Sequence, residues 1–172
     1  MKFRALWQFT ALGICVLAHG IAASAPLLDV RESIALSVAP GTAWQAVKDF
    51  DNMAWHPAVA TTQLTAGRNN ERQAVRLLTL KDGATMREQL REYDDARRAQ
   101  HYAMLDSPLP VTDYEASLAV TQGEGGGAVV TWQARFRRKE GAAMDDTAVR
   151  STISGIFAAG LGNLKQLLQG QR

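Results

Sequence analysis

Apolar and polar residues alternate along most of the chain up to residue 138, and this spacing predicts β-strands. The alternation is clearest over 111–121 and 129–138, where every second residue is apolar and its neighbours are largely polar. Further strands are predicted at 29–38, 59–66, 72–80, 85–93 and 98–105. Short turn sequences such as Lys81-Asp82-Gly83 separate consecutive strands, so sequence neighbours are expected to pair antiparallel.

The spacing changes at the C-terminal end, between residues 145 and 168. Apolar residues recur there at steps of three and four, which places them on one face of a long α-helix. Acidic and hydroxyl side chains stand at its start, where they can cap free N–H groups. Gly160 and Gly162 interrupt the apolar ridge, although glycine costs a helix up to about 1 kcal/mol. We expect these glycines to thin the helix, leaving room for a bound molecule or for close packing.

The order of elements predicts an α+β fold. Trp44, Val47 and Phe50 have helical spacing, and two short helices are expected after the first strand. Seven antiparallel strands with one apolar face would curl around the long C-terminal helix and enclose a space. Nothing in the sequence divides residues 27–172, which are predicted to form one domain.

The N-terminal residues have the pattern of a secretory signal peptide. Lys2 and Arg4 precede an apolar run over 5–17, and small residues follow it. We therefore expect a signal peptide over 1–24, cleaved between residues 22 and 25, and a periplasmic mature protein. The apolar run is shorter than the roughly 20 residues that cross a bilayer, so no membrane span is expected in the mature protein.

Charge and cysteine content narrow the possible functions. Without Lys2 and Arg4, the 19 basic residues fall to 17 and equal the 17 acidic ones, so nucleic acid is not an expected partner. The one cysteine, Cys15, lies in the predicted signal peptide and leaves no thiol or disulfide in the mature protein. No histidines or cysteines have metal-ligand spacing, so neither a metal nor another cofactor is expected.

Several short motifs, taken in order, resemble those of one protein superfamily. They are Val38-Ala39-Pro40, Trp55-His56-Pro57, the run from Arg76 to Gly83, Glu88-Gln89-Leu90, the run from Leu109 to Tyr114, and Trp132. This series resembles the polyketide cyclase/dehydrase branch of the START-like (Bet v 1-like, SRPBCC) superfamily. Within it, the chain is most similar to periplasmic MxaD-type proteins, which are linked to the methanol dehydrogenase system.

The resemblance implies a helix-grip fold around a hydrophobic cavity, without implying catalysis, because this fold also hosts carriers and receptors. A more distant similarity to plant abscisic-acid receptors implies ligand-contacting positions. These fall on His56, Leu78, Leu80, Glu88, Tyr102, Met104 and Tyr114. We add Trp132 and Ile156 as cavity walls, with Ile153 and Phe157 as further candidate lining on the long helix. Where those receptors have a lysine, this chain has His56, and its gating loop is shorter, so neither their ligand nor their switch is expected here.

Glu88 is the least expected residue of the predicted interior. Met86, Glu88 and Leu90 share a strand face, so a carboxylate stands among apolar side chains. A buried carboxylate needs a partner, an altered pKa or a wet cavity. Glu88 is therefore either a polar anchor for a ligand, a general acid or base, or a strand-end residue that reaches solvent or an arginine.

Other polar candidates also have two interpretations each. His56 is either a hydrogen-bonding anchor, with Glu88 as a candidate partner, or a loop residue packed beside its neighbours. Tyr102 and Tyr114 face inward, as wall residues of a polar pocket or as core aromatics with satisfied hydroxyls. For Arg76 we favour exposure to solvent, with an ion pair to Glu88 as the alternative.

These features favour a non-enzymatic exported protein that binds a small apolar or amphipathic molecule or assists a periplasmic oxidoreductase. One alternative is a polyketide cyclase- or dehydratase-like enzyme in which Glu88 or His56 is the acid/base. Another is an interaction protein that works through its surface, including Arg135 and Arg137.

Overall fold

The computed structural model describes residues 25–170 and contains one sheet of seven antiparallel strands. In space the strands follow the order β1-β7-β6-β5-β4-β3-β2, so every pair except β1–β7 joins sequence neighbours. The strands are β1 (Leu27–Leu36), β2 (Val59–Ala66), β3 (Val75–Leu80), β4 (Thr85–Asp94), β5 (Ala99–Asp106), β6 (Val111–Gln122) and β7 (Ala128–Arg138).

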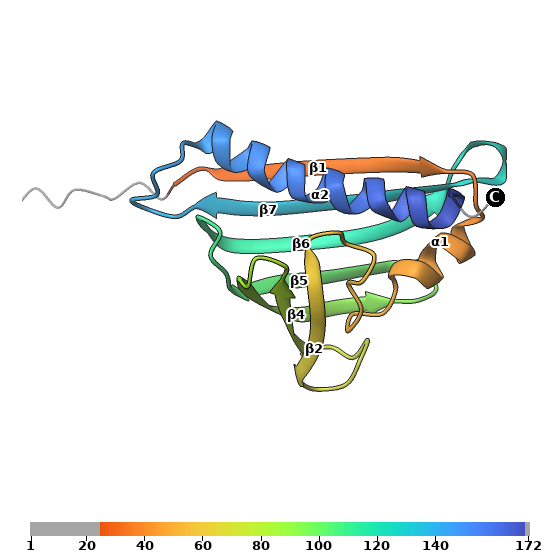
Figure 1. Ribbon diagram of the computed structural model, residues 1–172, viewed down its shortest axis with the longest axis horizontal. Helices are drawn as coiled ribbons and strands as arrows, with labels where there is room; N and C mark the ends of the chain where they lie inside the picture. Colours follow the sequence, from red (N-terminus) through yellow and green to blue (C-terminus); the bar gives the residue numbers. More distant parts are fainter. Residues whose placement is uncertain (1–24, 171–172) are drawn as a thin grey trace, which may run out of the picture.

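Two α-helices and the sheet form the predicted helix-grip arrangement. Helix α1 (Pro40–Val47) follows β1, and the long helix α2 (Asp146–Gln169) ends the described chain. Figure 1 shows α2 running along β1 and β7 while the sheet curves away from it toward β2. A short 3-10 turn, η1 (Glu124–Gly126), lies in the β6–β7 connection. The predicted fold class, a curved seven-stranded sheet around a C-terminal helix, is confirmed.

Helix α2 forms where the apolar spacing predicts it. Its N-cap is Asp145, whose carboxylate accepts a hydrogen bond from the backbone N–H of Ala148 at 2.8 Å. Most of its apolar face is buried against the sheet, while Ile156 and Leu168 are half-buried and Leu167 is 46% exposed. The buried residues of α2 are Val149, Ile153, Phe157, Gly160, Leu161 and Leu164.

The chain between α1 and β2 differs from the expected second short helix. Turns occupy residues 50–57, and side chains from the β2–β3 connection bind the backbone there. The N–H of Phe50 donates to Asn70, and the N–H of Asp51 donates to Asn69. These amides satisfy donors that a helix would otherwise use internally, and Pro57 restricts the residue before it to extended conformations.

Some strand ends also differ from the sequence expectation. Strand β3 begins at Val75 rather than at residue 72, because Asn70 and Gln73 adopt positive φ angles of 61° and 73°. Such angles interrupt an extended chain. Strand β1 spans Leu27–Leu36, two residues earlier than the predicted 29–38.

The predicted signal peptide over 1–24 lies outside the described residues. Within residues 25–170, no helix is both long and apolar enough to cross a membrane.

Candidate functional site

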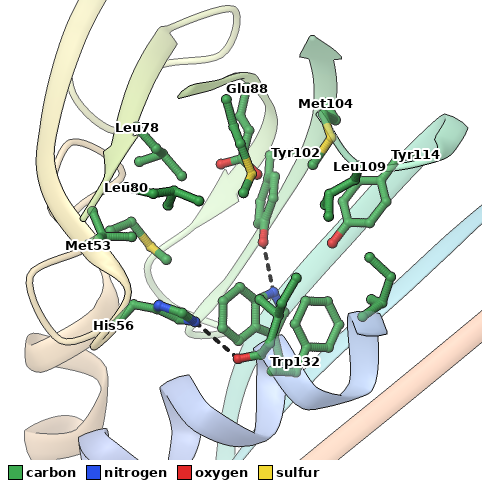
Figure 2. A pocket seen from close by; sticks show the side chains of 15 residues that line it. Met53, His56, Leu78, Leu80, Glu88, Tyr102, Met104, Leu109, Tyr114 and Trp132 are labelled. Atoms are coloured by element: carbon green, nitrogen blue, oxygen red, sulfur yellow. Dashed lines mark hydrogen bonds between the residues drawn. The ribbon is translucent and has the colours of Figure 1, made fainter. Parts of the chain in front are cut away.

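A small pocket lies between the concave face of the sheet, the loop before β2 and helix α2 (Figure 2). The centre of a water molecule can occupy about 40 Å³ of it. Such a space admits water-sized groups but no bulky guest. Its lining is Met53, His56, Val59, Leu78, Leu80, Met86, Glu88, Tyr102, Met104, Leu109, Tyr114, Trp132, Ile153, Ile156 and Phe157.

All nine residues expected at a ligand site lie in this lining, as do the further candidates Ile153 and Phe157. Side chains on one face of neighbouring strands are brought together by alternation within each strand and by the strand order. Glu88 pairs with Met104 across β4 and β5, and Tyr102 pairs with Ala116 across β5 and β6. That these residues contact a ligand stays a prediction.

Four lining residues were not anticipated. Met86 shares the strand face of Glu88 and could have been found by parity alone. Met53, Val59 and Leu109 come from connections or their ends, where the sequence has no periodicity to indicate which side chain points inward. Leu109 stands between two prolines in the β5–β6 connection and closes the pocket beside Met104 and Tyr114 (Figure 2).

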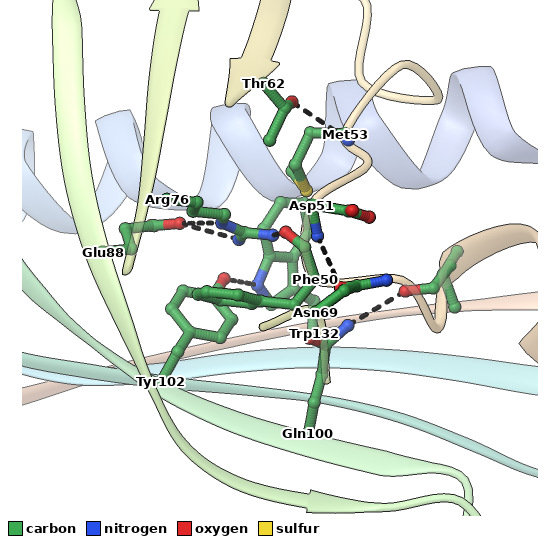
Figure 3. Close-up of polar contacts among 11 residues, drawn as sticks. Phe50, Asp51, Met53, Thr62, Asn69, Arg76, Glu88, Gln100, Tyr102 and Trp132 are labelled. Carbon is green, nitrogen blue, oxygen red and sulfur yellow. Dashed lines mark hydrogen bonds and ion pairs between the residues drawn. The ribbon is translucent and has the colours of Figure 1, made fainter. Parts of the chain in front are cut away.

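The expected exposure of Arg76 is wrong: the residue is 1% exposed and forms an ion pair with Glu88 (Figure 3). Nε and Nη2 of Arg76 each lie 2.7 Å from Oε2 of Glu88. The two residues pair across β3 and β4, so the sheet register brings them together. Both faces of β3 are fairly apolar, so the sequence does not indicate which side of this strand is buried.

The buried guanidinium is satisfied by further contacts. Nη1 of Arg76 donates to the carbonyl oxygen of Phe50 at 2.8 Å. Its central carbon lies 4.2 Å from the ring centre of Phe50 and 5.0 Å from that of Tyr102. Hydrogen bonds and aromatic faces together compensate for the water that a buried arginine loses. The pair is thus electrically neutral as a unit, and it presents Glu88 to the pocket.

His56 lines the pocket with carbon atoms rather than with a free nitrogen. Nε2 lies 3.0 Å from the carbonyl oxygen of Ile156, and Nδ1 accepts from the N–H of Ala58 at 3.2 Å. A carbonyl only accepts hydrogen bonds, so Nε2 carries a proton. Nδ1 accepts a hydrogen bond and so carries none, which makes the ring neutral. Burial lowers the pKa of His56, opposed by the Ile156 hydrogen bond and the charge of Glu88. No hydrogen bond or ion pair joins His56 to Glu88 in the described structure.

The two pocket tyrosines differ in their hydrogen bonding. The indole N–H of Trp132 donates to the hydroxyl oxygen of Tyr102 at 2.7 Å, whereas Tyr114 stacks its ring on Phe136 at 5.9 Å. Among residues 25–170 no protein group bonds to the Tyr114 hydroxyl, which points into the pocket (Figure 2). Burial raises the pKa of both hydroxyls, so both stay protonated.

Aromatic rings form the floor of the pocket against α2. Trp132 stacks on Phe157 with ring centres 4.3 Å apart, and His56 meets Trp132 edge-on at 5.9 Å. Trp55 packs against Trp132 at 5.2 Å, and its carbonyl accepts from Asn163 of α2 at 2.9 Å. This cluster fixes the loop before β2 to the helix.

The two candidates for acid–base chemistry are engaged in this structure. Glu88 is held by Arg76, and both nitrogens of His56 are used by backbone groups. In the described range, no three His, Cys, Asp or Glu side chains gather where they could hold a metal ion. The arrangement therefore suits binding of a neutral group better than proton transfer.

Comparisons with known proteins agree with this geometry. Among curated proteins, none matches the chain in sequence. Protein XoxI from Bacillus cereus is 27% identical with a TM-score of 0.74, over 81% of this chain and 94% of XoxI. An uncharacterised protein from Bacillus thuringiensis is 26% identical with a TM-score of 0.74, over 82% of this chain and 98% of its own.

A third solved structure, of a protein from Thermobifida fusca, is 27% identical with a TM-score of 0.69, over 81% of this chain and 92% of its own. The family model described as "Polyketide cyclase / dehydrase and lipid transport" matches residues 28–169, nearly the whole described chain. The chain therefore belongs to the polyketide cyclase/dehydrase and lipid transport family of START-like proteins, as its sequence predicts.

Proposed function

We propose that this protein is an exported, non-enzymatic binding protein that holds a small amphipathic molecule in the pocket between sheet and α2. The observation that carries the proposal is the lining, in which apolar side chains surround a polar corner made by Glu88, Tyr102 and Tyr114. Ligand sites of proteins have this composition, with few polar groups that orient the guest. The family to which the chain belongs is a ligand-binding one, which is further support.

We further propose that the protein works in the periplasm beside a dehydrogenase of the methanol dehydrogenase type. The basis is the likeness to XoxI and the MxaD-type motifs, together with the signal-peptide pattern over 1–24. The cyclase or dehydratase alternative has less support, because Glu88 and His56 are both bonded to other groups and would first have to be released.

Binding is tested with the ¹⁵N-labelled mature protein and a panel of small neutral amphipathic molecules. Binders should shift the resonances of pocket residues and raise the melting temperature. Ile156→Phe should abolish both effects by filling the pocket, whereas Leu167→Phe, on the exposed side of the same helix, should leave them unchanged. If only the resonances of surface residues shift, or if no molecule of the panel shifts any resonance, the binding role is contradicted.

The dehydrogenase role needs its own experiment. Purified protein should raise the rate of electron transfer from a periplasmic quinoprotein alcohol dehydrogenase to its cytochrome, and it should be captured from periplasm with one of them. Charge reversal at Arg135 and Arg137 measures whether the outer face of β7 contributes. No capture and no rate change would remove this partner while leaving the binding role standing.

A further inference from the structure

The carboxylate of Glu88, in the polar corner of the pocket, has one oxygen atom that no protein group uses among the described residues. Both contacts from Arg76 fall on Oε2 of Glu88, and no other described protein group donates to its Oε1. Glu88 lines the pocket and is not among the described side chains whose oxygen atoms are fully enclosed without a partner. One carboxylate oxygen therefore remains able to accept a hydrogen bond from a guest.

Two donors accompany this acceptor. The indole nitrogen of Trp132 can only donate, so the Tyr102 oxygen accepts and its own O–H is left to donate. The hydroxyl of Tyr114 has no partner among residues 25–170 and also points inward (Figure 2). Glu88 is opposite Met104 and Tyr102 is opposite Ala116, so Tyr102 is a diagonal neighbour of both Glu88 and Tyr114 on one sheet face, while Glu88 and Tyr114 lie two strands apart. The corner thus offers two donors and one acceptor.

The other polar groups near the pocket add no further hydrogen-bond donor or acceptor for a guest. Both nitrogens of His56 are occupied by Ile156 and Ala58, so this residue contributes only carbon surface. Arg76 lies behind Glu88 with its donors on Glu88 and the Phe50 carbonyl. The walls away from the corner are apolar, formed by side chains such as Leu78, Leu80 and Phe157.

We infer that the pocket recognises a small neutral alcohol, whose oxygen accepts from Tyr102 and Tyr114 and whose O–H donates a hydrogen bond to Glu88. A hydroxyl accepts two hydrogen bonds and donates one, which matches the corner group for group. This inference rests on the proposed binding function and names its ligand class. The volume of about 40 Å³ limits the alcohol to a short apolar tail.

Other functional groups leave part of the corner unsatisfied. A ketone or aldehyde accepts from both tyrosines but has no proton for Glu88. A carboxylate adds a second negative charge beside Glu88, and an ammonium group adds a positive charge where Arg76 already neutralises Glu88. Each mismatch leaves a buried polar group without a partner or a buried charge uncompensated, which is costly in an apolar site.

The test compares molecules of equal size and different chemistry. 2-Propanol, acetone and acetate have the same number of non-hydrogen atoms and are titrated into ¹⁵N-labelled mature protein while pocket resonances are followed. We expect 2-propanol to bind at least about tenfold tighter than acetone, because acetone cannot donate a hydrogen bond to the carboxylate. Acetate should bind weakest. The indole N–H signal of Trp132 should shift with 2-propanol, since its acceptor Tyr102 then becomes a donor, while that of Trp44, bonded to Asp95, should not.

Two variants test the donors. Tyr114→Phe keeps the ring and its stacking on Phe136 but should weaken 2-propanol binding about fivefold or more. Tyr93→Phe removes a surface hydroxyl that donates to Asp95 and should not change the affinity. Equal affinity for 2-propanol and acetone, or full affinity in Tyr114→Phe, would overturn the alcohol assignment while the binding function stands. A pocket that responds to none of the three molecules would also overturn the alcohol assignment, while the binding function would still be decided by the wider panel of amphipathic molecules.

Discussion

Gly160 of α2 and His56 of the loop before β2 approach so closely that a side chain on the glycine has no room. A Cβ placed on Gly160 would lie 2.5 Å from Cδ2 of His56 and about as close to two tryptophan rings, 3.0 Å from Trp132 and 3.1 Å from Trp55. The helix is therefore thin at this point because the aromatic cluster packs against its backbone. A Cβ on Gly162 would meet no such neighbour within 4 Å.

Gly160→Ala and Gly162→Ala should consequently act in opposite directions. Both replace a helix-interior glycine and remove its entropic cost, which alone stabilises by about 0.5–1 kcal/mol. At Gly160 the added methyl must displace packed rings, which costs about 1–3 kcal/mol and exceeds the helical gain. Urea unfolding of the two variants measures the difference, and equal stabilisation by both would show that the rings yield freely.

The buried ion pair should respond more strongly to losing one partner than to losing both. Arg76→Met leaves the Glu88 carboxylate buried without its cation, which we expect to cost about 3–5 kcal/mol of unfolding free energy. The double variant Arg76→Met/Glu88→Leu removes both charges, and should be less destabilised than the single variant. Chemical denaturation of both proteins provides the comparison, and a double variant no more stable than Arg76→Met would contradict this account.

The sheet and the long helix could be predicted because the spacing of their apolar residues indicates directly which side chains are buried. In β7, Val130, Trp132, Ala134 and Phe136 are buried as their alternation indicates. Most of the pocket positions are implied by the resemblance to the plant abscisic-acid receptors, and alternation within each strand explains why these residues face one cavity.

Features that depend on partners distant in sequence could not be predicted. The turns over residues 50–57 replace a helix because Asn69 and Asn70 supply the hydrogen bonds. Arg76 is buried because the Phe50 carbonyl and the Tyr102 ring reach it, and the ring of His56 is fixed in place because Nε2–H donates to the distant Ile156 carbonyl. None of these relationships has a local signature in the chain.

His56 should make the stability of the protein depend on pH below neutrality. Its pKa is lowered from the ordinary value of 6.5, chiefly by burial, so as pH falls the unfolded chain takes up the proton first. Stability is then present in full above about pH 6.5 and decreases as pH falls toward the folded-state pKa. Protonation of Nδ1 would also break the hydrogen bond from Ala58.

The contribution of His56 is isolated by measuring unfolding free energy from about pH 7.5 to about pH 5. His56→Phe should flatten the pH dependence in this interval, whatever its effect on stability at neutral pH. His101→Gln, which removes the half-exposed histidine near Glu115, is the matched control and should retain the slope. A slope unchanged in His56→Phe would assign the titration to other groups.

Tyr102→Phe and Tyr114→Phe make the same chemical change on adjacent strands and should have unequal consequences. Loss of the Tyr102 hydroxyl leaves the buried indole N–H of Trp132 without its acceptor, at a cost of about 1–3 kcal/mol. The Tyr114 hydroxyl bonds to no protein group among the described residues, so its removal should be neutral or slightly stabilising while ligand affinity falls. Thermal unfolding without ligand separates the two variants. Equal destabilisation would mean that Tyr114 has a structural partner, and its hydroxyl could not then be reserved for a guest.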